Sequence, residues 1–92
     1  MLNEKIKELR VANGINQVVL AEKIGVSKQC VSNWESGYIQ PSIDMLVRLA
    51  RMFSVSTDYL LGLADKRFLN ADGLTDTQVA RIQSIIDDIR NK

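Results

Sequence analysis

The sequence contains no histidine and only one cysteine, Cys30. These shortages exclude a histidine general base, a zinc site built from cysteine and histidine, and an internal disulfide. Cys30 is expected on the inward side of a helix, where a free cysteine behaves as a small apolar residue and has no neighbour to activate it. We therefore expect a protein that is not an enzyme and that uses neither a metal nor a cofactor.

Long apolar runs are also missing, and no signal segment is evident, so we expect a cytoplasmic protein without a membrane partner. Ninety-two residues fit one small domain and a short appendage, with no evident small-molecule site. The net charge of +1 gives little support for nucleic-acid binding. The local charge is more informative, because the stretch from Lys23 to Trp34 contains two lysines and no acidic residue.

The stretch from Asn16 to Gly37 predicts two short helices joined by a turn. Asn16 and Ser27 each precede a helix-compatible run, where a side-chain oxygen can accept from unpaired backbone N–H groups. Gly25 can end the first helix in a left-handed conformation without steric cost. Two capped helices around a glycine turn are typical of a helix-turn-helix, whose second helix contacts the target.

The second helix of this unit has an apolar face and a polar face. At about 100° per residue, Val31 and Trp34 fall on one side of it. The opposite side carries amide, hydroxyl and ammonium groups that can bond base edges in the major groove of DNA. These groups could also form an ordinary solvated face, although the outward N-terminus of a capped second helix favours base reading. The candidates for base reading are Lys28, Gln29, Ser32 and Asn33.

Residues 2–62 resemble the phage repressor and Cro family of helix-turn-helix regulators, also called the Xre family. The landmarks that carry the resemblance occur in order: Gln17, Leu20-Ala21, Gly25-Val26-Ser27, Trp34-Glu35-Ser36-Gly37, Pro41-Ser42 and Asp58-Tyr59-Leu60-Leu61-Gly62. The resemblance implies an all-α fold with a five-helix DNA-binding domain. It also implies a homodimer that binds a near-palindromic operator in double-stranded DNA.

The resemblance further implies roles for residues outside the base-reading face. Gln17, at the start of the first motif helix, would contact a DNA phosphate, which agrees with the attraction of a helix N-terminus for anions. Ser27 and Tyr38 are further candidates for phosphate contacts, although the family more often has a lysine or arginine in place of Tyr38. Arg10 would pair with Glu35 and hold two helices in register; the alternative is two unrelated surface charges.

Helical spacing of apolar residues predicts the remaining core. Ile6 and Leu9 belong to such a stripe in an N-terminal helix, and another stripe follows Ser42. A last short helix runs to Leu61, which we expect to help close the core. Arg48 is expected to be a solvated charge.

Beyond the domain of residues 1–62, the sequence predicts a linker at 63–74 and an amphipathic helix at 75–92. Thr75 and Gln78 match a capping box at the start of that helix. Its apolar stripe could pair with a second copy, fold back on the domain, or dock to another protein, and homodimer contact is the interpretation that we favour. The candidate dimerisation residues are Val79, Ile82, Ile85, Ile86 and Ile89.

Together these features predict a sequence-specific transcriptional regulator, expected to be a repressor that occupies its operator as a dimer. The alternative, from another class, is an adaptor or antitoxin-like module whose C-terminal helix binds a protein partner.

Overall fold

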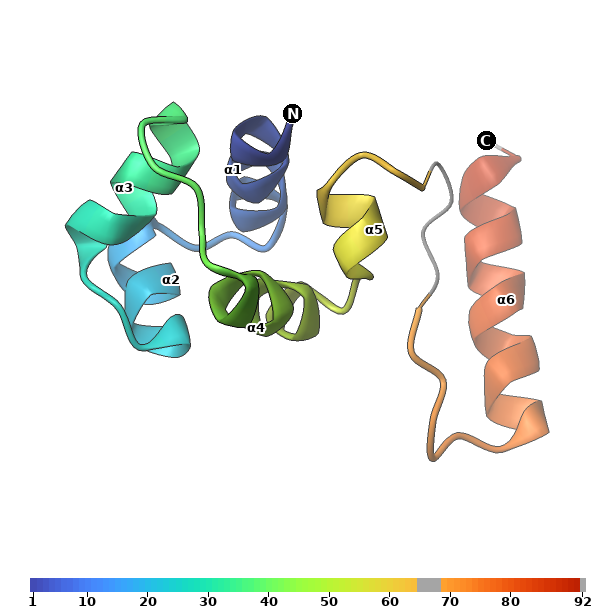
Figure 1. Cartoon of the computed structure of the whole chain (residues 1–92). Coiled ribbons are helices and arrows are strands. Elements are labelled where there is room, and N and C mark those ends of the chain that lie inside the picture. The colour runs from blue at the N-terminus through green and yellow to red at the C-terminus, as the bar shows by residue number, and fades with distance from the viewer. Residues whose placement is uncertain (65–68, 92) are drawn as a thin grey trace.

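The computed structural model describes residues 1–64 and 69–91, and this part of the chain is all-α. Its helices are α1 (Leu2–Ala12), α2 (Gln17–Ile24), α3 (Lys28–Ser36), α4 (Ile43–Phe53), α5 (Thr57–Leu60) and α6 (Asp76–Arg90). Figure 1 shows α1 to α5 packed together, with α6 standing apart from them. The predicted all-α fold, five helices followed by a C-terminal helix, is therefore confirmed.

Short polar residues determine where most of these helices begin. The side chains of Asn16, Ser27, Ser42 and Ser56 each accept a hydrogen bond from a backbone N–H in the first turn of α2, α3, α4 and α5. Thr75 does the same for α6 as part of a capping box. Each cap satisfies a donor that the helix itself leaves unpaired, so the sequence fixes these starting points locally.

A single hydrophobic core holds α1 to α5 together. Each of these helices contributes one aliphatic side chain that is fully buried: Ile6, Leu20, Val31, Leu49 and Leu60. Trp34 of α3 is also buried in this cluster. Because burial of apolar surface is the main stabilising contribution, this core holds α3 in place, chiefly against α1 and α2.

The prediction that Leu61 helps to close the core is wrong. Its side chain is 43% exposed, whereas that of the preceding residue, Leu60, is only 1% exposed. The reason is the length of α5, which has four residues and therefore little more than one inward position. Gly62 follows in a left-handed conformation, with φ of 76°, and turns the chain away.

Arg48 of α4 is exposed, as the sequence suggested, and it also bonds to a neighbouring helix. Its guanidinium Nη1 donates to the carbonyl oxygen of Ile24, at the end of α2, across 3.2 Å. A cation at this position satisfies a carbonyl that the helix leaves unpaired and complements the negative end of the helix dipole. Arg48 therefore links α4 to the end of α2, next to the turn that leads into α3.

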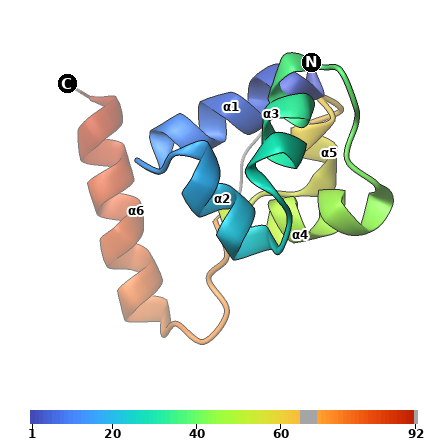
Figure 2. The ribbon, with the colours of Figure 1, turned by 90° about the vertical axis from the view of Figure 1, so that its left-hand side faces the viewer.

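The C-terminal helix adds nothing to this core. None of the residues of α6 is buried, and Figure 2 also shows it outside the bundle. The predicted linker at 63–74 includes residues 65–68, which lie outside the described residues, and its remainder contains neither helix nor strand. Within the described ranges, no helix is long and apolar enough to cross a membrane.

Candidate nucleic-acid interface

The turn between α2 and α3 is held by backbone hydrogen bonds and by a cap. Gly25 ends α2 with φ of 88°, and its N–H and that of Val26 both donate to the carbonyl of Ala21, at 2.8 and 3.0 Å. Ser27 then begins α3, its hydroxyl oxygen accepting from the Cys30 N–H at 3.1 Å. Local bonds therefore define the angle at which α3 leaves α2.

Removing the cap of α3 should destabilise the protein measurably. We expect Ser27→Ala to lower the free energy of unfolding by about 1 kcal/mol, because the first turn of α3 loses an acceptor for a backbone N–H. Urea unfolding followed by circular dichroism measures this change. Ser27→Asp, which keeps an acceptor at the cap, should unfold near the original midpoint. Equal stability of Ser27→Ala and the original chain would contradict this role for the hydroxyl.

The two faces of α3 are segregated as its helical phase predicts. Val31 and Trp34 are buried, at 0% and 3% exposure, and Cys30 packs at the edge of the core. The side chains predicted to read bases lie outside this buried set. Of them, Lys28 and Gln29 are exposed, and Ser32 and Asn33 are half-buried.

Two of these side chains are joined to each other. The Gln29 amide Nε2 donates to Asn33 Oδ1 across 3.0 Å, one turn further along α3. The bond uses one of two amide hydrogens on Gln29 and one of two lone pairs on Asn33. Both amides therefore retain donors and acceptors for a base edge, while each restricts the rotamers of the other.

The structure brings Arg10 and Glu35 together in a bidentate ion pair. Arg10 Nε lies 2.7 Å from Glu35 Oε2, and Arg10 Nη2 lies 3.0 Å from Oε1. The side chains are only 12% and 4% exposed. Hydrogen bonding to Glu35 raises the pKa of Arg10 in spite of its desolvation. Arg10 Nη1 also donates to the Ile15 carbonyl at 2.9 Å, so this pair fixes α1 against α3 and the segment before α2.

Gln17 is part of the same network. Its amide Nε2 donates to Glu35 Oε1 across 3.2 Å, so that Glu35 joins α1, α2 and α3. This inward bond was not predicted, but the helical phase of α2 indicates it. With Leu20 at zero, Gln17 falls near 60°, between Ile24 at about 40° and Ala21 at about 100°, in the buried stripe of α2. One amide hydrogen and the carbonyl oxygen of Gln17 keep capacity for another contact.

The other two candidates for phosphate contact lie at opposite ends of α3. Ser27 is exposed at its start, and Tyr38, which is 79% exposed, follows its end. The backbone N–H of Tyr38 donates to the carbonyl of Asn33 at 3.0 Å. Because this bond fixes the chain after α3, the phenol projects from an anchored backbone.

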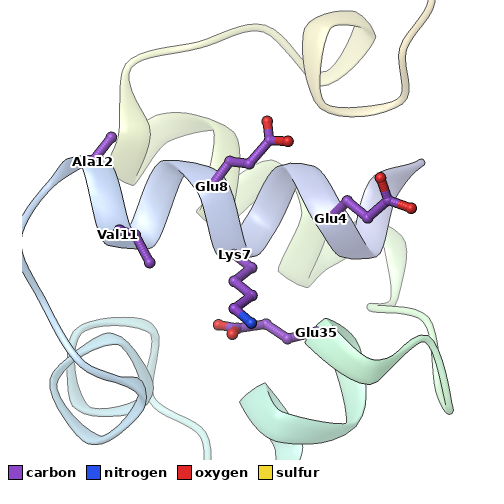
Figure 3. Close-up of a pocket in the computed structure, with 6 residues that line it drawn as sticks. All are labelled: Glu4, Lys7, Glu8, Val11, Ala12 and Glu35. Atoms are coloured by element: carbon purple, nitrogen blue, oxygen red, sulfur yellow. The ribbon is translucent and has the colours of Figure 1, made fainter.

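An open hollow lies beside α1 and is shown in Figure 3. Its lining residues are Glu4, Lys7, Glu8, Val11, Ala12 and Glu35. Glu35 is already paired with Arg10, so the remaining charges are the carboxylates of Glu4 and Glu8 against the ammonium of Lys7, a balance that does not favour a phosphate backbone. Among the described residues, no three His, Cys, Asp or Glu side chains are grouped so that they could hold a metal ion.

A family model described as helix-turn-helix matches residues 6–60. The uncharacterized HTH-type transcriptional regulator YobD of Bacillus subtilis is 42% identical over 65 residues, which are 71% of this chain and 58% of YobD. The HTH-type transcriptional regulator ImmR of the same organism is 41% identical over 61 residues, which are 66% of this chain and 48% of ImmR.

Among solved structures, the P22 c2 repressor protein in complex with synthetic operator 9T superposes with a TM-score of 0.66. The two sequences are 31% identical, and the match covers 70% of this chain and 97% of the repressor chain. The matched part spans about half the length of the two curated relatives.

Proposed function

The chain belongs to the helix-turn-helix family, and we propose that it is a sequence-specific, double-stranded DNA-binding transcriptional regulator. The observation that carries the proposal is the segregation of α3. One face is buried against the other helices of the bundle, and the other presents amide, hydroxyl and ammonium groups. Such groups on a rigid helix are suited to base edges in a major groove. Because a transcriptional regulator must reach the DNA that it binds, we also propose that the protein works in the cytoplasm.

In the proposed complex, contacts divide into positioning and reading. Gln17, Ser27 and Tyr38 would hold the protein on phosphates, with the Gln17 amide already oriented by its bond to Glu35. Lys28, Gln29, Ser32 and Asn33 would reach the bases. Lys28 and Gln29 lie in the first turn of α3. In a recognition helix, the N-terminal residues usually contact the base edges.

We also propose that the protein acts as a homodimer on a near-palindromic operator and represses by occupying it. The likeness to an operator-bound phage repressor supports this mode of action. The exposed apolar stripe of α6 supports a dimer, since an amphipathic helix requires a partner for its apolar face.

Selection of bound sequences from a random duplex pool, with the full chain at near-physiological salt, tests the proposal. Non-specific phosphate binding is weak under these conditions, so that preference becomes visible. We expect enrichment of an inverted repeat whose half-site centres are about one helical turn apart. The control is the double variant Gln29→Ala/Asn33→Ala, which removes one exposed and one half-buried amide and leaves the core intact. This variant should lose the preference for the selected DNA sequence.

A protein-interaction module, adaptor or antitoxin-like, is the second candidate function. The observation that favours it is again the exposed stripe of α6, which could serve a different protein. DNA binding without sequence preference, combined with a chain that stays monomeric, would favour this module over the regulator.

A further inference from the structure

The apolar residues of α6 follow a heptad repeat. Val79 and Ile86 occupy its a positions, and Ile82 and Ile89 occupy its d positions. Val79, Ile82 and Ile89 are exposed within the described structure, at 38%, 40% and 67%, and Ile86 is half-buried. The stripe is therefore spaced for packing against another helix, and none of its residues is buried in the described structure.

One edge of this stripe carries an ordered set of polar residues. Asp76, Gln83 and Arg90 occupy successive e positions, so they line the same edge from the first turn of α6 to the last. The charge along the edge runs from negative through neutral to positive. Asp76 and Arg90 are equally far from Gln83 along the chain. The edge is therefore complementary in charge to a second copy of itself that runs in the opposite direction.

We propose that α6 pairs with α6 of a second copy in an antiparallel orientation. This inference rests on the proposed dimer and specifies its interface. Reversal of one helix brings the two e edges together, so Asp76 of each copy faces Arg90 of the other, and the two Gln83 side chains meet near the twofold axis. The a and d residues then pack in mixed layers, with Val79 opposite Ile89 and Ile82 opposite Ile86.

A parallel pair would bury the same apolar side chains, so the charges decide the orientation. In a parallel pair each e residue faces a g residue of the other helix, five positions earlier. Arg90 would then face Ile85, Gln83 would face Gln78, and Asp76 would face no residue of α6. The helix dipoles would also lie side by side in the same direction, whereas they oppose favourably in the antiparallel pair.

Self-complementarity is also the reason for choosing a second copy over an unrelated protein. Two identical edges that are complementary when antiparallel form a closed dimer with twofold symmetry, the commonest symmetry of soluble oligomers. The contact involves one helix of 15 residues from each copy, which is small for a protein interface. We therefore expect a dimer that dissociates on dilution, so covalent capture is the suitable measurement.

Site-specific crosslinking of the full chain tests the orientation. Cys30→Ala removes the only cysteine, and Gln83→Cys, Ile89→Cys or Ser84→Cys is then introduced singly on exposed positions of α6. Each protein is treated with a short bifunctional maleimide at several concentrations, without DNA. Circular dichroism establishes that every variant keeps its helix content.

We expect Gln83→Cys to shift from monomer to covalent dimer as concentration rises. Ile89→Cys should stay monomeric, because the two copies of residue 89 would be about 15 Å apart along the antiparallel axis at 1.5 Å per residue. Ser84→Cys, on the outer face, measures random collision. Capture through Ile89→Cys but not Gln83→Cys would establish a parallel pair, and capture no greater than that of Ser84→Cys would refute pairing. Because the crosslinking is done without DNA, its result is independent of the DNA-selection experiment. Absence of crosslinks would refute the α6 pairing but not sequence-specific DNA binding, and absence of sequence preference would refute DNA reading but not the α6 pairing.

Discussion

Glu35→Ala is expected to lower the free energy of unfolding by about 3–5 kcal/mol, the usual cost of removing one partner from a buried ion pair. Arg10 would keep its charge at 12% side-chain exposure, with only the Ile15 carbonyl left among the bonds described for its guanidinium. Gln17 would lose its acceptor as well. Urea denaturation of the full chain measures the loss.

The more exposed ion pair of Lys5 and Glu8, whose charged atoms are 3.4 Å apart, provides the matched control. Its side chains are 30% and 65% exposed, so Glu8→Ala should change stability by no more than about 1 kcal/mol. Arg10→Met/Glu35→Leu removes both charges together and should recover much of the loss. If Glu35→Ala cost no more than Glu8→Ala, the Arg10–Glu35 pair would not hold the bundle together.

Gln29→Ala should change the base preferred at one position of each half-site, at a cost of about 1–3 kcal/mol for the original sequence. The reason is that a bidentate amide contact to a base edge would be lost. Competition binding against all four bases at each position measures the change. By contrast, Gln17→Ala should weaken binding to every sequence alike, since a phosphate contact carries no base information.

The hydrogen bond between Gln29 and Asn33 should couple the effects of substituting either residue. Because each amide restricts the other, the effects of Gln29→Ala and Asn33→Ala on affinity should not be additive. A double-mutant cycle on the selected operator measures the coupling. An unchanged preferred sequence after Gln29→Ala would show that this side chain does not read a base.

The features that sequence reasoning predicted well are those with local causes. The caps at Asn16 and Ser27 and the glycine that ends α2 depend only on residues within one turn, so their sequence signals are direct. The two faces of α3 follow from its helical phase, because its apolar and polar residues are cleanly separated.

The features that were missed depend on contacts between distant segments or on where a helix stops. The bond of Gln17 to Glu35 links α2 to α3, and that of Arg48 to Ile24 links α4 to α2. Neither partner is fixed by spacing in the sequence. Leu61 was misplaced because a helix of one turn has no second repeat from which its inward face can be read. The stripe of α6 was found from its spacing, but spacing alone does not identify the surface that it packs against.

The division of α3 into a buried face and an exposed face has an evolutionary consequence. Val31 and Trp34 keep the helix in place, whereas Lys28 and Gln29 contribute nothing to that packing. After gene duplication, the exposed positions of one copy could therefore diverge without loss of folding. A few substitutions there could change what α3 contacts, while the buried residues preserve the scaffold that presents them.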